Sequence, residues 1–171
     1  MDRRIVVFAS VFLTYCVSSD ASADWLRFRG PNGTAVSESA APTEFGMEKN
    51  LKWKLELPGK GVSSPIIVGD KVFVTAYSGY GVTRGEGSVE DLKRHLLCVD
   101  RKSGEQLWEK TVDSVSQEDS YSGRGIPTHG YASHTPVSDG ERVYVFFGKS
   151  GVVAYDLDLS LIHISEPTRP Y

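Results

Sequence analysis

The sequence predicts an all-β protein built from repeated units of short antiparallel strands, and three observations support this prediction. Residues 65–74 (PIIVGDKVFV) match residues 136–145 (PVSDGERVYV) at a constant offset of 71. β-Branched and aromatic residues occur in short runs separated by Gly- and Asp-containing turns, which is the pattern of strands. Helical periodicity appears nowhere at length. Self-similarity in a fixed order indicates a repeat architecture.

The chain begins with the pattern of a secretory signal peptide, over residues 1–23. Two arginines precede an apolar stretch at residues 5–17, and Ala21-Ser22-Ala23 forms a cleavage site. This stretch is shorter than the roughly 20 residues that a membrane-spanning helix needs. We therefore expect an exported protein, periplasmic or extracellular, with no transmembrane span after cleavage. Cleavage would leave Cys98 as the only cysteine, so no intramolecular disulfide is expected.

A complete unit is expected over residues 63–112. Pro65 opens a short strand, where its missing N–H costs least. The turn at Gly69-Asp70 leads into KVFVTA, and HLLCVD and EQLWEKTV follow as third and fourth strands. Before the third strand, SVEDLKRH (residues 88–95) is expected to form up to two helical turns capped by Ser88. Four short antiparallel strands per unit are the pattern of a propeller blade.

A second unit, over residues 133–158, is expected to be incomplete. SDGE supplies its turn, and RVYVFF and GVVAYD its second and third strands, before the pattern stops. Residues 159–169, LSLIHISEPTR, match the translation of a common transposase-based sequencing adapter. We therefore expect residues 159–171 to be an artefact and the chain to be an N-terminal fragment.

Three residues of the first unit are suited to stabilise its turn and its packing. The Asp100 carboxylate is suited to bond the backbone N–H groups of the turn that follows it. Gly104 suits a turn position with positive φ. Trp108 offers a large apolar surface for the gap between neighbouring blades. We assign all three a structural role.

The stretch CVDRKSGEQLW resembles the signature A-x-D-x-x-T-G-x-x-x-W of pyrroloquinoline-quinone (PQQ)-type propeller repeats. Asp100, Gly104 and Trp108 match, whereas Cys98 replaces Ala and Ser103 replaces Thr. Residues 24–50 are similar to the leader of such propellers, and the stretch from residue 51, with Trp53, looks like the outer strand of a preceding blade. The resemblance implies the first blades of a truncated PQQ-like β-propeller, which in full form typically has eight.

Candidate site residues are those that precede the first strand of each unit. The resemblance places this strand beside the central channel, so Ser63, Ser64, His134 and Thr135 are the candidates for a channel-mouth site. The favoured interpretation is simpler, with hydroxyl groups capping turns and a solvated histidine. No catalytic residue and no metal site is predicted. The acidic pairs Glu90-Asp91 and Glu118-Asp119 are expected to be solvated loop residues.

Two functions remain open. The net charge is −3, and Lys and Arg are scattered, so a nucleic-acid partner is not expected. The favoured hypothesis is an exported, non-catalytic scaffold that binds proteins, similar to the propeller lipoproteins of outer-membrane protein assembly and without a cofactor. The alternative is a quinoprotein dehydrogenase that oxidises an alcohol or sugar with PQQ and calcium. The adjacent cysteine pair frequent in those enzymes is absent from this sequence.

Overall fold

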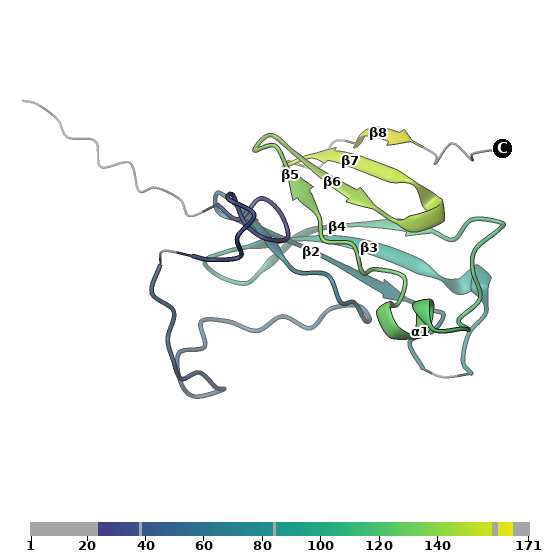
Figure 1. Cartoon of the computed structure of the whole chain (residues 1–171), viewed down its shortest axis with the longest axis horizontal. Helices are drawn as coiled ribbons and strands as arrows, with labels where there is room; N and C mark the ends of the chain where they lie inside the picture. The colour runs from purple at the N-terminus through teal and green to yellow at the C-terminus, as the bar shows by residue number, and fades with distance from the viewer. Residues whose placement is uncertain (1–23, 38, 84, 159–160, 166–171) are drawn as a thin grey trace, which may run out of the picture.

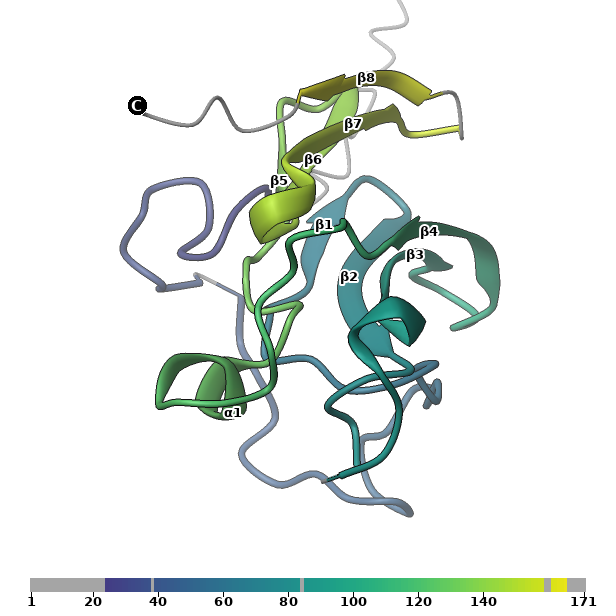
Figure 2. The same ribbon diagram turned by 90° about the vertical axis from the view of Figure 1, so that its right-hand side faces the viewer.

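Two four-stranded antiparallel sheets form the body of the structure. The computed structural model describes residues 24–37, 39–83, 85–158 and 161–165. The strand orders are β1-β2-β3-β4 and β5-β6-β7-β8, so each sheet is a simple meander. The second sheet is layered over the first in both ribbon views (Figures 1 and 2). We call the first sheet blade 1 and the second sheet blade 2.

Blade 1 has the four strands expected for the complete unit. Its strands are β1 (Ile66–Val68), β2 (Lys71–Ser78), β3 (Lys93–Asp100) and β4 (Gln106–Asp113). Gly69 has φ of +57° in the turn between β1 and β2, a conformation that glycine adopts readily. A register shift at Cys98 and Val99 interrupts the pairing of β3 with β4. Such a bulge increases the local twist of the strand.

Blade 2 repeats this meander on a shorter scale. Its strands are β5 (Val137–Ser138), β6 (Arg142–Phe146), β7 (Val152–Asp156) and β8 (Leu161–Ser165). Strand β8 lies within the segment that the sequence assigns to adapter-derived residues, and it pairs antiparallel with β7. Strand pairing uses backbone N–H and C=O groups, which almost any sequence carries, so the pairing of β8 does not show whether its residues are native. The adapter origin of residues 159–171 therefore stays a prediction.

Within the described residues, helical structure is confined to three short segments, η1 (Val89–Asp91), α1 (Gly125–His129) and η2 (Gly148–Ser150). The expected helical segment over residues 88–95 is present only as the single turn η1, with Ser88 as its N-cap residue, because Lys93 already begins β3. There it pairs with Ser78, and His95 pairs with Ala76. Pairing with β2 over all eight residues outweighs a weak local preference for helix. The sequence did not predict α1.

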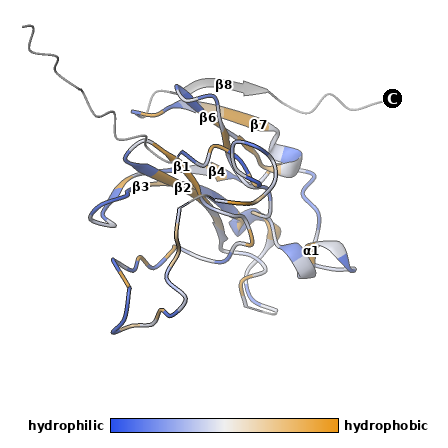
Figure 3. Ribbon diagram, turned by 60° about the vertical axis from the view of Figure 1, so that its left-hand side comes forward, coloured by the Kyte–Doolittle hydropathy of each residue, from blue (hydrophilic) through white to orange (hydrophobic). Residues whose placement is uncertain are grey.

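The main core lies between the two blades. From blade 1 it takes Ile66, Phe73, Leu96 and Cys98, all fully buried, and Trp108 packs against them. The blade 2 side is formed by Val143, Val145, Phe147, Val153 and Tyr155. Much of the hydrophobic colour lies on the strands, whereas the outlying loops are mixed (Figure 3). Burial of these facing surfaces drives the two sheets together.

The opposite face of blade 1 is covered by the segment expected to be an outer strand. Trp53 and Leu55 pack against Ala76, Leu97 and Val99. Residues 51–57 have no strand assignment, so the structure gives this segment the position of an outer strand without its ladder of hydrogen bonds.

The start of the leader lies along the inner edge of the blades. Trp25 exchanges two backbone hydrogen bonds with Ile67, at 2.9 and 3.0 Å. The carbonyl group of Leu26 accepts a hydrogen bond from the N–H of Ser138 in β5, at 2.9 Å. Residues 24–26 therefore connect the first strands of the two blades. Further along the leader, large apolar side chains such as Phe45 and Met47 are exposed.

Candidate functional site

The four candidate residues at the starts of the blades lie together, and a hydrogen bond between two of them joins the blades. The N–H of Ser64 donates to Oγ1 of Thr135 at 3.0 Å. The Ser63 hydroxyl donates to the carbonyl group of Thr75 at 3.3 Å and accepts from the Thr75 hydroxyl at 2.8 Å. The ring of His134 is exposed on one side and stacks edge-on against Phe146, with ring centroids 4.7 Å apart.

The repeat-motif residues have the geometry of a stabilised turn. Oδ1 of Asp100 accepts hydrogen bonds from the backbone N–H groups of Lys102 and Ser103, at 2.8 and 2.7 Å. These bonds, led by that of Ser103, lower the pKa of Asp100. Gly104 has φ of +77°. Trp108 lies 5.6 Å from Phe73 between ring centroids, within the core between the blades.

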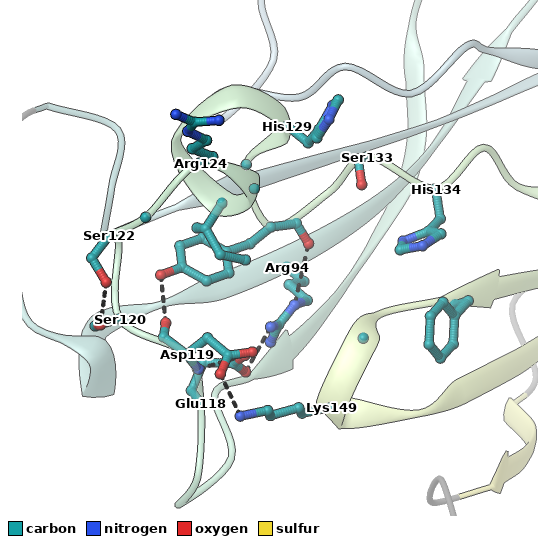
Figure 4. Close-up of a pocket in the computed structure, with 17 residues that line it drawn as sticks. Arg94, Glu118, Asp119, Ser120, Ser122, Arg124, His129, Ser133, His134 and Lys149 are labelled. Carbon is teal, nitrogen blue, oxygen red and sulfur yellow. Dashed lines mark hydrogen bonds and ion pairs between the residues drawn. The ribbon is translucent and has the colours of Figure 1, made fainter.

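A pocket opens where the connector between the blades, residues 114–136, meets blade 2. Strand pairing places the β2–β3 loop, the connector and η2 at one end of the blades, and the tight turns at Gly69 and Gly140 at the other. The pocket has a volume of about 790 Å³ and is lined by residues from β3, the connector, the end of β6 and η2 (Figure 4). We call it the joint pocket.

A buried ion pair lies at the joint pocket. Nη2 of Arg94, in β3, contacts Oε2 of Glu118, in the connector, at 2.6 Å, and both side chains are at most 3% exposed. Arg94 also donates to the carbonyl group of Tyr131 and to the hydroxyl of Ser150, at 3.3 and 3.1 Å. Oε2 of Glu118 accepts no hydrogen bond of normal geometry within the described part of the chain. The prediction that Glu118 is solvated is therefore wrong, because this carboxylate neutralises the buried Arg94.

A second, exposed ion pair ties the connector to blade 2. Nζ of Lys149, in η2, contacts Oδ1 of Asp119 at 2.6 Å and donates to the carbonyl group of Gln117 at 2.7 Å. Asp119 thus has a cationic partner, although it is half exposed as the sequence predicted for a loop. Tyr131 lies between these pairs and donates to the carbonyl group of Asp119 at 2.6 Å. Burial, followed by the nearby Tyr80 and Glu118, raises the pKa of Tyr131.

Comparison with known families identifies the architecture. A family model described as outer membrane protein assembly factor BamB, which is built on the PQQ repeat, matches residues 31–158. The chain belongs to this family. No match was found among the curated proteins that were compared. The predicted fold is confirmed: blades 1 and 2 are blades of a PQQ-like propeller, and the regular structure of the described residues is all-β apart from short helical segments.

Blade 1 also contains a row of three hydrogen-bonded polar side chains. Nε2 of His95 lies 2.7 Å from Oγ of Ser78, and its Nδ1 lies 2.6 Å from Oε1 of Glu109. The order Ser–His–carboxylate is that of a hydrolase triad. However, none of the three residues lines the joint pocket, and the His95 side chain is only 7% exposed. We assign these three side chains a structural role, because their hydrogen bonds connect three adjacent strands of blade 1.

Only one residue of the joint pocket was among the site candidates predicted from the sequence. His134 was a candidate and lines it, whereas Ser63, Ser64 and Thr135 do not. The residue pattern did not predict the contributions of Arg94, Glu118, Tyr131 and Lys149. Arg94, close to the apolar run LLCV in the predicted strand, was an available signal, since an arginine buried in a strand requires a partner.

No helix in the described ranges has the length and apolar character needed to cross a membrane.

Proposed function

We propose that this chain belongs to an exported propeller that binds other proteins as a non-catalytic scaffold, in the assembly of outer-membrane proteins. The description of the matching family supports this assignment. The expected signal peptide at residues 1–23 supports export, although it lies outside the described residues.

One observation carries the proposal: the groups nearest the expected channel already have protein partners. The Thr135 hydroxyl accepts a hydrogen bond from the N–H of Ser64 between the blades, and the Ser63 hydroxyl bonds to Thr75 within blade 1. Residues 24–26 bond to β1 and β5 along the inner edge. At the end formed by the connector, by contrast, the joint pocket leaves cationic and apolar side chains accessible. Loops held on a rigid scaffold are the usual position for partner binding.

The alternative requires residues that fit PQQ and calcium. Calcium binds six to eight oxygen ligands, several of them carboxylates. The carboxylates of the joint pocket belong to Glu118 and Asp119, and each is paired with a cationic side chain, Arg94 and Lys149 respectively. These residues suit a calcium ion poorly. Across the described residues, no cluster of three or more metal-binding side chains occurs.

Site-specific photocrosslinking of the full chain, produced with its signal sequence in a bacterial envelope, tests the proposal. A photoreactive phenylalanine analogue replaces Phe146, which is 41% exposed at the joint pocket. The matched control replaces Lys102, which is exposed at the opposite end of blade 1. We expect the same envelope protein to be crosslinked from position 146 in repeated preparations, and no such adduct from position 102.

Two results would overturn the scaffold. One is the absence of any adduct that distinguishes position 146 from position 102. The other is saturable binding of PQQ in the presence of calcium, together with dye reduction that depends on an alcohol or sugar, which would favour the dehydrogenase.

A further inference from the structure

The joint pocket combines a cationic rim with an aromatic wall, and this combination specifies a ligand. Figure 4 shows Arg124 and His129 on one side of the pocket. The ring of His134 lies against that of Phe146, at the end of β6. The pocket, at about 790 Å³, is large enough for several amino-acid side chains.

The charge that remains for a ligand is positive. Arg94 is neutralised by Glu118, and Lys149 is paired with Asp119. Within the described residues, the side chains of Arg124 and His129 have neither an ion-pair nor a hydrogen-bond partner, although both line the pocket. The negative charges of Glu118 and Asp119 are therefore already neutralised, whereas the positive charge of Arg124 is not. A ligand that carries carboxylates matches this rim.

The wall of the pocket is apolar and aromatic. Phe146, at the end of β6, is 41% exposed, and its ring meets the edge of His134. Ile126 and Tyr131 extend this surface along the connector. Tyr131 is held rigidly, since it bonds to Asp119 and its ring lies 5.7 Å from the Arg94 guanidinium carbon. An aromatic side chain of a ligand would pack against Phe146 and remove its apolar surface from water.

We propose that the joint pocket binds an extended peptide segment of a partner protein, in which acidic residues adjoin an aromatic residue. Acidic groups would lie at Arg124 and His129, and the aromatic side chain against Phe146. This inference rests on the proposed scaffold function and specifies the chemistry of its partner. A peptide supplies both acidic and aromatic groups in one molecule, which a simple inorganic anion does not.

Fluorescence anisotropy with the full chain and labelled pentapeptides tests the inference. The probe is Glu-Glu-Phe-Glu-Glu, and the two comparison peptides are Lys-Lys-Phe-Lys-Lys and Glu-Glu-Gly-Glu-Glu. We expect the probe to bind at least tenfold more tightly than either, and its affinity to fall as salt is raised from 50 to 300 mM. The salt series and the lysine peptide test the charge contact, and the glycine peptide tests the aromatic contact.

Variants locate the binding. Arg124→Glu is expected to weaken binding of the probe at least tenfold, and Phe146→Ser by a similar factor. Arg124 has an exposed side chain without a partner in the described residues, so its replacement should leave the thermal unfolding transition unchanged. The matched control is Arg29→Glu, at an exposed arginine of the leader that does not line the pocket, and it should bind the probe as the unaltered chain does.

Three outcomes would overturn the inference: equal binding of the acidic and basic peptides, unchanged binding by the Arg124→Glu variant, or complete displacement of the probe by an equimolar amount of phenylacetate. The last result would indicate a site for small aromatic acids. If the probe fails to bind while the crosslink from position 146 persists, the scaffold function stands and the peptide chemistry is wrong. If the crosslink is absent, the scaffold function itself fails.

Discussion

Trp53 donates its indole N–H to the backbone carbonyl group of Arg101 at 2.9 Å, and Trp108 forms the corresponding bond one blade later, with Leu157 at 3.3 Å. Arg101 and Leu157 each follow the aspartate that ends the third strand of their blade, so the two bonds are equivalent. Each joins a tryptophan at the outer-strand position of one blade to the turn of the neighbouring blade. The repeat in sequence is thus also a repeat of one contact between blades.

Gly104 is the residue on which the first of these contacts depends. A Cβ atom at Gly104 would lie 2.5 Å from the Trp53 ring, and φ is +77° there. We expect Gly104→Ala to lower the free energy of unfolding by at least about 2 kcal/mol, through backbone strain and displacement of the indole. Gly69→Ala is the control, because Gly69 also has positive φ but open space around it, and it should cost about 1 kcal/mol. Urea unfolding measures both, and equal losses would contradict the role of Trp53.

The buried pair of Arg94 and Glu118 should respond to single and double replacement differently. Glu118→Met leaves the Arg94 charge buried without compensation, which typically costs about 3–5 kcal/mol. The double variant Arg94→Met, Glu118→Met removes both charges and should recover much of that loss. Asp119→Asn, in the exposed pair with Lys149, should cost no more than about 1 kcal/mol. A double variant that is no more stable than Glu118→Met in urea unfolding would argue against this coupling.

Asp139 should titrate at unusually low pH. A hydrogen bond from the Tyr144 hydroxyl, followed by the backbone N–H groups of Glu141 and Arg142, lowers the pKa of Asp139 to about 2. The folded-state pKa lies below the unfolded value, so this carboxylate stabilises the fold above about pH 4, and the contribution is lost as the pH falls toward 2. Tyr144→Phe removes the largest cause and should raise the pKa. NMR titration of the Asp139 carboxyl carbon measures this, and an unchanged midpoint in the variant would exclude the hydroxyl as the cause.

Cys98 should be unreactive in the folded protein. Its side chain is fully buried in the core between the blades, and this burial raises the pKa of the thiol to about 12. Only the thiolate reacts with disulfide reagents. We expect no labelling of Cys98 by Ellman's reagent at pH 8 under native conditions, and rapid labelling in guanidinium chloride. Rapid labelling without denaturant would indicate that the two blades separate readily.

The strands and the motif residues were predictable because their causes are local. The turn at Asp100 needs only a carboxylate followed by free N–H groups, and the alternation of KVFVTA is visible within six residues. The expected helix over residues 88–95 is limited to the single turn η1 for the converse reason: its sequence is compatible with helix, but pairing with β2 places Lys93–Asp100 in a strand.

The joint pocket could not be predicted in the same way. Glu118 and its neighbour look like any acidic pair in a loop, and nothing nearby in sequence indicates that Arg94 lies against them. His134 was identified from its place before a strand, but its contact with Phe146 depends on how the connector is folded.

The sequence by itself determined the all-β class, the two repeated units, and the roles of Asp100, Gly104 and Trp108, since strand pattern, turn geometry and repeat spacing are encoded over a few neighbouring residues. Only the tertiary structure decided that Glu118 is buried against Arg94 and that the connector encloses a pocket with blade 2. The physical reason is that the free energy of a buried charge depends on which distant groups surround it, and packing of the two blades brings those groups together.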